Sequence, residues 1–311
     1  MAQVFSSRDS RDLASNNIGT LGDWLSLMKP RVMSLALFTA LIGMLVAPTA
    51  TASHPILLII SLIAIAGGAG GSAVLNQWYD RDIDAKMFRT ATRPLPRQCI
   101  DPNEAVSFGL VISAMSVLVL GFSANALAAG MLAFTIFFYA VIYTAWLKRR
   151  TRQNIVIGGA AGALPPVIGW LAAGGDPLHP LPWLLFAIIF IWTPPHFWAL
   201  ALVRKKEYIR AKVPMLPAVA TTTSSKLQIA MYSLVLVPIT LAPTAWGFTS
   251  AWFGVGALVL GTGFLLAPLR LVFAGPTTLT QASLALFRYS ITYLFLLFAA
   301  LGVDAYSIYI I

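Results

Sequence analysis

The sequence predicts an all-α integral membrane protein in which nine transmembrane helices form a bundle around a central cavity. Of the 311 residues, 58% are hydrophobic and only 10% are charged, whereas a soluble domain has roughly 25% charged residues. Apolar stretches recur along the chain, each near the ~20 residues that a helix needs to cross a bilayer. Approximately, they cover residues 31–49, 56–78, 104–123, 128–147, 154–173, 182–202, 227–246, 251–269 and 289–310.

The basic residues predict how these helices are oriented. If every helix spans, Lys and Arg number four before the first helix, then zero, five, zero, four, zero, six, zero and two between and after the others, so all 21 lie on one face. The positive-inside rule then places the N-terminus in the cytoplasm and the C-terminus in the periplasm of a bacterial cytoplasmic (inner) membrane. The net charge of +10 therefore reflects orientation, and it excludes nucleic acid as a partner.

The beginning of the chain predicts a tail and then one domain. Residues 1–28 mix acidic and basic side chains with Ser and Asn, which is typical of a disordered cytoplasmic tail and not of a signal peptide. Residues 29–311 form a single transmembrane domain, because no polar stretch is long enough to fold separately. Pro30 suits the first turn of the first span. Since Cys99 is the only cysteine, an intrachain disulfide and a Cys-based metal site are excluded.

A cluster of charges, NQWYDRDIDAKMFRTATRPLPR at residues 76–97, follows the second apolar stretch. If that helix continues, Asn76, Asp80 and Asp84 lie on one face with about 6 Å of rise between neighbours. Asp82 then points elsewhere. Two carboxylates and an amide oxygen on one stripe form a set of hard ligands suited to Mg²⁺.

Arginines extend the pattern, because Arg89, Arg93 and Arg97 follow at four-residue steps. The guanidinium fork matches the oxygens of a phosphate. The regular spacing of both signs of charge favours a site for a metal ion and a diphosphate. The alternative is a charged loop that only marks the cytoplasmic side of the membrane.

The fourth to sixth predicted helices carry features of a ligand pocket. Tyr139 and Tyr143 are one turn apart, so their rings either stabilise a carbocation or pack in the core. The following basic turn, which begins at Lys148, is either a topology anchor or a phosphate contact. The pairs at 165–166 and 194–195 are prolines that remove backbone donors, which the bilayer tolerates where the backbone lines a cavity. We expect both pairs to face a shared pocket near mid-membrane, and a transporter would use broken helices similarly.

A second polar region follows the sixth apolar stretch at residues 204–216. There, Tyr208 and Lys212 are one helical turn apart. His196 lies about two turns earlier and is the only histidine within the cytoplasmic half of the membrane, where ionisable residues usually face a cavity. Its alternative is a hydrogen-bonded core histidine.

These motifs resemble the intramembrane prenyltransferase superfamily, which carries NxxxDxxxD on the second of nine helices. Four blocks, LNQWYDRDIDAKMFRTATRPLP, LKRRTRQNIVIGGAAGALPPVIGW, WTPPHFWALAL and EYIRAKVPMLP, resemble its haem O synthase branch, the protohaem IX farnesyltransferases. The resemblance implies a bundle whose active site opens to the cytoplasm and transfers the farnesyl group of farnesyl diphosphate to a vinyl group of haem b. The product would be haem O for terminal oxidase biogenesis, with Mg²⁺ as cofactor, haem b as a substrate, and a haem A synthase or terminal oxidase as protein partner.

The resemblance also implies roles for individual residues. Most members carry a second DxxxD after the sixth helix, whereas this chain has Tyr208 and Lys212 there, so a lysine stands where those members hold a second metal ion. The implied sets are Asn76, Asp80 and Asp84 for the metal and catalysis, Tyr208 and Lys212 for catalysis, Arg89, Arg93, Lys148 and Lys212 for the diphosphate, Tyr139 and Tyr143 for the prenyl pocket, and His196 for haem.

Two alternatives remain open at this point. A related membrane prenyltransferase would use a quinone precursor or another aromatic acceptor, and a second DxxxD would favour it. A transporter for an anionic substrate predicts polar groups on both sides of its cavity. The outer segments carry only Asp176 as a formal charge, which favours an enzyme supplied from the cytoplasm and the lipid.

Overall fold

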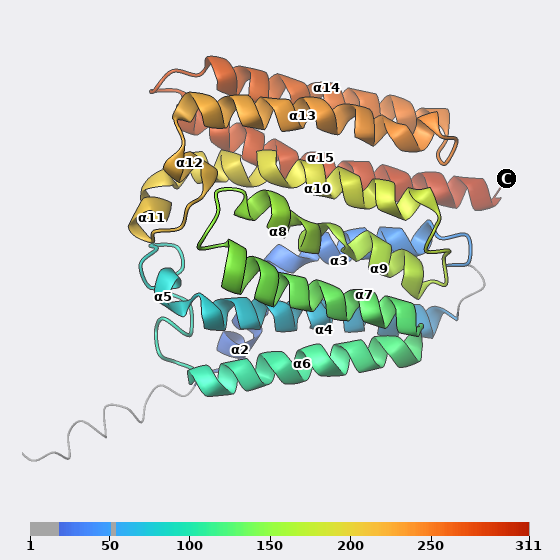
Figure 1. The fold of residues 1–311 in the computed structure, drawn as a ribbon. Coiled ribbons are helices and arrows are strands. Elements are labelled where there is room, and N and C mark those ends of the chain that lie inside the picture. Colours follow the sequence, from blue (N-terminus) through green and yellow to red (C-terminus); the bar gives the residue numbers. More distant parts are fainter. Residues whose placement is uncertain (1–18, 51–53, 311) are drawn as a thin grey trace, which may run out of the picture.

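The computed structural model describes residues 19–50 and 54–310, and this part of the chain is helical, with no β-strand (Figure 1). Long helices run side by side, and their connections gather at the two ends of the bundle. The helices are α2 (Leu21–Leu27), α3 (Pro30–Leu45), α4 (Pro55–Tyr79), α5 (Arg81–Asp84), α6 (Pro102–Ser123), α7 (Ala126–Phe137), α8 (Asn154–Ala163), α9 (Pro165–Ala172), α10 (Pro180–Val203), α11 (Lys205–Arg210), α12 (Leu216–Val219), α13 (Thr222–Ala245), α14 (Ala251–Phe273) and α15 (Leu279–Ile310). A π-helix, η2 (Phe138–Leu147), continues α7.

The predicted all-α membrane architecture is confirmed. Within the described ranges, eight helices are long and apolar enough to cross a membrane, or nine if α2 and α3, bent by 52°, count as one span. The first predicted span was too long, since α3 ends at Leu45. The predicted disordered tail was also too long: residues 1–18 lie outside the described part of the chain, but Leu21–Leu27 form a helix whose Leu27 is fully buried.

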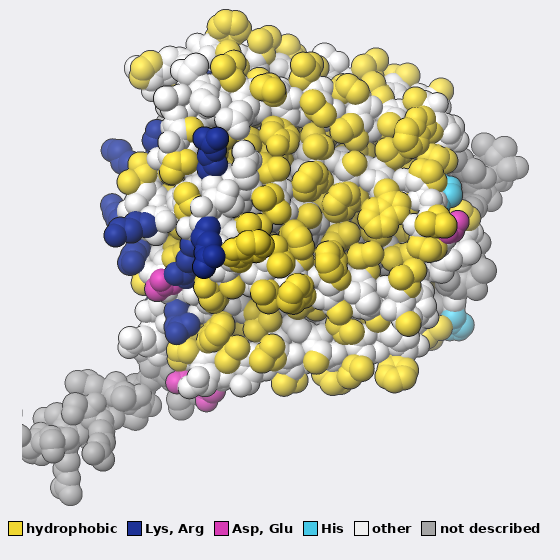
Figure 2. All heavy atoms as spheres, viewed as in Figure 1, with side chains coloured by type: hydrophobic (Ala, Val, Ile, Leu, Met, Phe, Trp, Pro, Cys, Tyr) yellow, Lys and Arg dark blue, Asp and Glu magenta, His cyan; other side chains and the backbone are white. Residues whose placement is uncertain are grey.

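Charged side chains gather at one end of the bundle. In Figure 2, Lys and Arg lie at the end formed by α5 and α11, and hydrophobic side chains cover most of the remaining visible surface. This distribution is typical of a polytopic membrane protein, because the hydrocarbon region disfavours charge. The charged end is also where the functional site lies.

Three of the long helices begin with the same local signal, a polar cap followed by proline. Asp101 accepts a hydrogen bond from the backbone of Asn103 at the start of α6. His54 and His179 cap α4 and α10 in the same way, because their Nδ1 atoms accept from backbone N–H groups two residues later. A proline at the first helical position needs no hydrogen-bond acceptor, so it suits these starts.

Glycines allow α3 and α9 to pack closely. A Cβ added at Gly43 would lie 2.1 Å from the carbonyl oxygen of Pro166, and one at Gly169 would lie 2.0 Å from that of Ala40. Small residues at such contacts are a common device for helix association in lipid. They bring the chain start next to the middle of the bundle and thereby place Lys29 near the site.

The two proline pairs behave differently. Pro165 and Pro166 follow a break at Leu164 between α8 and α9, as expected, whereas Pro194 and Pro195 lie inside α10, which remains one helix. All four prolines are buried. The expectation that α10 is broken was wrong, and packing against α8, α13 and α15 explains how the helix continues past the missing donors.

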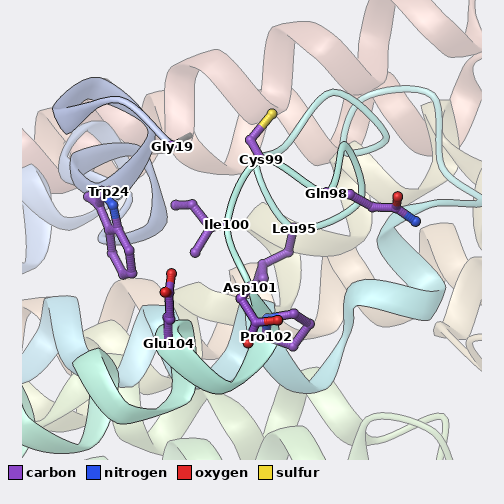
Figure 3. A pocket seen from close by; sticks show the side chains of 9 residues that line it. All are labelled: Gly19, Trp24, Leu95, Gln98, Cys99, Ile100, Asp101, Pro102 and Glu104. Carbon is purple, nitrogen blue, oxygen red and sulfur yellow. The ribbon is translucent and has the colours of Figure 1, made fainter. Parts of the chain in front are cut away.

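Two cavities adjoin the bundle, and neither is lined by a predicted site residue. One, of about 570 Å³, lies between α2, residues 95–101 and the start of α6, and Figure 3 shows Trp24, Cys99 and Glu104 around it. The other, of about 590 Å³, is apolar and lies between α7, α8 and α10, with Trp183 and Phe186 in its wall. The predicted shared pocket at the proline pairs corresponds to neither.

Candidate active site

The predicted stripe of ligands forms at the end of α4. Asp80 ends that helix with φ −89° and ψ 7°, and the short helix α5 follows, so the predicted continuous helix was wrong in detail. The four-residue spacing survives the break, because the backbone N–H of Asp80 donates to Asn76 (3.0 Å) and that of Asp84 donates to Asp80 (2.8 Å). All three residues are buried, at 4%, 1% and 4% exposed for Asn76, Asp80 and Asp84.

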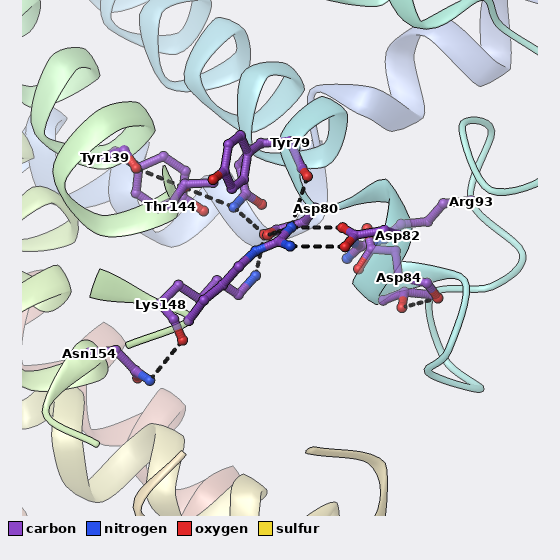
Figure 4. A network of polar contacts seen from close by, with 12 residues as sticks. Tyr79, Asp80, Asp82, Asp84, Arg93, Tyr139, Thr144, Lys148 and Asn154 are labelled. Carbon is purple, nitrogen blue, oxygen red and sulfur yellow. Dashed lines mark hydrogen bonds and ion pairs between the residues drawn. The ribbon is translucent and has the colours of Figure 1, made fainter. Parts of the chain in front are cut away.

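Every member of the stripe contacts at least one cation. Lys148 Nζ bonds Asp80 Oδ2 from the end of η2 (Figure 4). Arg93 Nη1 lies 2.6 Å from Asp84 Oδ2. Lys29 Nζ donates to Asn76 Oδ1 at 2.7 Å. Buried charges are retained only when they are paired or coordinated, so these contacts balance the carboxylates.

Asn76 is held by a chain of hydrogen bonds to η2. Its Nδ2 donates to Asp80 Oδ2 at 2.9 Å and to Thr144 Oγ1 at 3.0 Å. The Thr144 hydroxyl in turn donates to the carbonyl of Tyr139 at 2.7 Å, a five-residue step that fits the π-helix. These hydrogen bonds use both N–H groups of the Asn76 amide. The amide oxygen, Oδ1, therefore faces Lys29 and accepts its hydrogen bond.

Asp82 points away from the stripe, as predicted. Its side chain is 54% exposed and pairs with Arg149, whose nitrogens lie 2.7 and 2.9 Å from its oxygens. This hydrogen bonding holds the pKa of Asp82 below its usual range and raises the pKa of Arg149. The same guanidinium lies 3.6 Å from Asp80 Oδ1, so Arg149 links the outer carboxylate to the inner one.

The donor set fits a hard metal ion that keeps other ligands. In the described ranges, no three His, Cys, Asp or Glu side chains gather as a metal site. However, Asp80 Oδ1 is buried without a hydrogen-bond partner, and Asn76 Oδ1 and Asp84 lie on the same stripe. Mg²⁺ usually takes one or two carboxylates and completes its shell with water and phosphate. These residues therefore fit Mg²⁺ carried with a diphosphate.

The two tyrosines share one face of η2, as their spacing predicted. The ring centroids of Tyr139 and Tyr143 are 5.4 Å apart. A Cβ at Gly158 of α8 would approach the ring of Tyr143 to 2.1 Å, so only glycine there leaves room for the ring. The ring of Tyr143 therefore packs directly against α8.

The second polar region approaches the first, but only in part. Tyr208 of α11 packs with Ile83 and Met87 from the other polar segment, and burial raises its pKa. Lys212 is exposed, adopts φ +55°, and has no ion pair or hydrogen bond of its side chain to the described residues. Arg89 is likewise exposed. The structure thus brings Tyr208 to the site, while Lys212 and Arg89 make no direct contact with the stripe.

His196 forms a separate cluster between α10 and α15. Its ring stacks between Trp192 and Phe287, with centroids 4.3 and 4.6 Å away, and its Nδ1 lies 2.7 Å from Ser290 Oγ. None of these contacts involves the stripe, so the residues assigned to haem and to the metal are held by different helices.

Sequence reasoning missed three residues of the site. Lys29 adopts φ +53°, and its side chain donates to Asn76. The contacts of Thr144 were not predicted, because no sequence pattern indicated the π-helix that contains this residue. Asn154, fully buried, donates to the carbonyl of Lys148 at 3.3 Å. Of these three residues, only Lys29 had a signal in the sequence, which was its position directly before the helix-starting Pro30.

A bundle of membrane-spanning helices with buried carboxylates at one end is typical of an intramembrane enzyme. The chain belongs to the UbiA prenyltransferase family, whose model matches residues 36–291. It is 53% identical over 288 residues to protoheme IX farnesyltransferase 2 of Mesorhizobium japonicum, covering 92% of this chain and 90% of that protein. It is 55% identical over 284 residues to protoheme IX farnesyltransferase of Beijerinckia indica, covering 91% and 87%.

Solved structures show the same fold at low identity. Digeranylgeranylglyceryl phosphate synthase aligns with a TM-score of 0.75 and 17% identity, covering 92% of this chain and 98% of that one. A UbiA homolog from Archaeoglobus fulgidus bound to GPP and Mg²⁺ aligns with a TM-score of 0.61 and 15% identity, covering 89% and 99%.

Proposed function

We propose that this protein is a protohaem IX farnesyltransferase, which transfers the farnesyl group of farnesyl diphosphate to a vinyl group of haem b and gives haem O. The observation that carries the chemistry is the buried stripe, in which Asp80 Oδ1 has no hydrogen-bond partner and each of the three residues contacts a Lys or Arg side chain. The acceptor and the prenyl donor rest on relatives that are more than half identical over nine-tenths of this chain.

The reaction breaks one carbon–oxygen bond, forms one carbon–carbon bond and consumes one water molecule. The bond between C1 of the farnesyl group and the diphosphate oxygen breaks, and its electron pair leaves with the diphosphate. The vinyl group supplies the electrons of the new carbon–carbon bond, which leaves a cation on the vinyl carbon next to the macrocycle. Water adds to that carbon and loses a proton, giving a hydroxyethyl group that carries the farnesyl chain.

The stripe would act on the leaving diphosphate. Asn76, Asp80 and Asp84 would hold Mg²⁺, which supplies positive charge to the diphosphate oxygens when it is bound. Lys148 and Arg93 already lie at the carboxylates, so a small rotation of either side chain lets it contact an incoming phosphate. Charge that is fixed in place before the reaction is usually the largest contribution to catalysis.

Other residues would complete the two substrate sites. Tyr139 and Tyr143 would contact the allylic carbon through their ring faces, and Tyr208 would donate to the diphosphate. Lys212 and Arg89 are exposed, so they would reach the diphosphate only after their side chains turn inward. His196 would bind the iron of haem b.

Orientation follows from the charged end of the bundle. We propose that this end faces the cytoplasm of a bacterial inner membrane and that nine spans place the C-terminus in the periplasm. A reporter fused to the C-terminus should then be active only in the periplasm. Activity in the cytoplasm would show that the bent pair α2 and α3 does not cross the membrane.

The function is tested directly with membranes that contain the overproduced protein. Haem b and radiolabelled farnesyl diphosphate should give a labelled haem that co-elutes with haem O, together with one diphosphate per turnover. The Asp80→Asn protein in matched membranes is the control. If label instead enters a quinone precursor and haem b remains unchanged, the acceptor assignment is wrong.

A further inference from the structure

The structure gives His196 a defined tautomer through Ser290. The Ser290 hydroxyl has a single proton, and its Oγ lies 2.7 Å from the carbonyl oxygen of Phe287 and 2.7 Å from His196 Nδ1. A carbonyl oxygen can only accept, so both short contacts are satisfied together only if the hydroxyl donates to Phe287 and His196 Nδ1 donates to Ser290 Oγ. In the neutral ring this leaves Nε2 without a proton and with its lone pair free.

The surroundings fix this arrangement. Ser290 is fully buried, and Trp192 Nε1 donates to its backbone carbonyl at 2.8 Å. Trp192 and Phe287 cover the two faces of the His196 ring at interplanar angles of 18° and 26°. The ring is 8% exposed, and Nε2 has no hydrogen-bond partner in the described part of the chain. Phe197 lies nearly perpendicular to the ring, with centroids 5.0 Å apart, so a ligand would approach Nε2 in the plane of the imidazole.

The other two histidines show the opposite arrangement. His54 and His179 each accept a backbone N–H at Nδ1, from Ile56 at 3.3 Å and from Leu181 at 3.2 Å. A backbone N–H can only donate, so in their neutral forms both carry the ring proton on Nε2. Since the chain has three histidines, His196 is the one that this structure holds with Nε2 unprotonated.

We propose that Ser290 is a positioning residue that holds His196 as the Nδ1-protonated tautomer and so presents the Nε2 lone pair to the iron of the haem acceptor. Histidines that bind metals commonly donate their other ring N–H to a fixed acceptor, which sets the orientation of the ring. The edge left open between two aromatic rings suits a flat, apolar macrocycle. This inference rests on the proposed function, because haem is the acceptor there.

The tautomer is tested without haem. Full-length protein labelled with ¹⁵N-histidine and reconstituted in lipid should show, by solid-state NMR at a pH where imidazole is neutral, one Nδ1-protonated ring and two Nε2-protonated rings. The Nδ1-protonated signals should vanish in His196→Ala and lose their single-tautomer position in Ser290→Ala. If all three rings are Nε2-protonated in the native protein, the inference is wrong.

The consequence for haem is tested by absorption spectroscopy. Haem b titrated into the purified protein should give a ligand-shifted Soret band, which His196→Ala abolishes. Ser290→Ala should weaken haem affinity about tenfold or more, the range for residues that support a metal ligand, and Ser290→Thr should recover most of it because it keeps the hydroxyl.

A matched variant separates positioning from packing. Ser233 is also fully buried, and its hydroxyl donates to a carbonyl of its own helix at 2.8 Å without any side-chain partner. Ser233→Ala should therefore leave the Soret band and the affinity unchanged. Equal loss in Ser233→Ala and Ser290→Ala, or an unchanged band in His196→Ala, would overturn the inference. Absence of farnesyl transfer by native membranes with these spectra intact would instead refute the proposed function.

Discussion

Asp80 and Asp304 are equally buried, at 1% exposed, but lie at opposite ends of the bundle and are satisfied in different ways. Asp304 of α15 receives the backbone N–H of Ser250 at 3.1 and 3.3 Å and bonds the hydroxyl of the same residue. Asp80 Oδ2 accepts hydrogen bonds from the side chains of Lys148 and Asn76, whereas its Oδ1 has no hydrogen-bond partner and lies 3.6 Å from Arg149.

On this difference we propose a structural role for Asp304 and a functional role for Asp80. The donors of Asp304 belong to the first turn of α14 and cannot leave without unfolding it. The donors of Asp80 are side chains, and the longest of them, that of Lys148, reaches in from a neighbouring segment. Such donors can rotate toward a phosphate while a metal ion replaces them. Burial alone therefore does not identify the active carboxylate, but the kind of donor does.

The largest expected effect is on the functional side of this comparison. Asp80→Asn or Asp84→Asn should lower the turnover of farnesyl diphosphate by about 100-fold or more, the scale on which one preorganised charge-stabilising group acts. The loss should fall on kcat, because the charge on the leaving diphosphate grows only as the bond breaks. Turnover is measured with saturating haem b in membranes with matched protein levels. A change confined to KM would show that these carboxylates only bind substrate.

Lys29→Met should have the next largest effect. The substitution keeps the length of the side chain and removes the charge that lies 2.7 Å from Asn76 Oδ1. A hydrogen bond from a charged group contributes about 1.5–3 kcal/mol, so we expect roughly a tenfold or greater loss in kcat/KM for farnesyl diphosphate.

Another lysine provides the control for Lys29. Lys226 donates to the carbonyl of Ala274 at 2.5 Å, where it satisfies the end of α14 and lies outside the stripe. Lys226→Met should keep kcat/KM near the native value while it weakens the fold slightly. If the two variants lose kcat/KM equally, Lys29 acts only through the stability of the bundle.

Asp304→Asn should lower stability and leave turnover unchanged, in contrast to Asp80→Asn. The substitution replaces a charged acceptor of the Ser250 hydrogen bonds by a neutral one, and hydrogen bonds to charged groups contribute about 1.5–3 kcal/mol to folding. The stripe lies at the other end of the bundle. We therefore expect a lower midpoint of thermal unfolding in detergent, with turnover per folded molecule unchanged. If turnover fell while the midpoint of unfolding stayed the same, the end of the bundle opposite the stripe would take part in the reaction.

The sequence predicted the positions of this site better than its shape. The spacing of Asn76, Asp80 and Asp84 was sufficient, because four-residue steps stay on one face even across the break at Asp80. The role of Lys29 could not be predicted, because it depends on a left-handed backbone conformation before Pro30. Helical periodicity contains no information on such a bend.

The long helices were predictable because the sequence shows which segments meet lipid. The irregular parts were not, because they depend on contacts between helices. Hydrophobicity and the distribution of basic residues report how a segment meets lipid, so the long helices were evident. The π-helix η2 and the unbroken α10 depend on contacts between helices. Pro194 and Pro195 looked like a break because the sequence cannot show that neighbouring helices support them.

The smallest expected effect is at Asp82, which lies between its two functional neighbours along the chain. Its side chain is 54% exposed, and exposed ion pairs contribute about 0–1 kcal/mol. Asp82→Asn should therefore change turnover by no more than about fivefold. The change in turnover would come through Arg149, because this side chain loses its bond to Asp82 and also lies 3.6 Å from Asp80 Oδ1.

Salt separates this indirect effect from a direct one. Because the Asp82–Arg149 pair is exposed, high ionic strength should screen it, and the difference between Asp82→Asn and native turnover should shrink as salt is raised. The loss in Asp80→Asn should persist, because that carboxylate is buried. A salt-independent loss at Asp82 as large as that at Asp80 would show that Asp82 turns inward during the reaction and binds the metal itself.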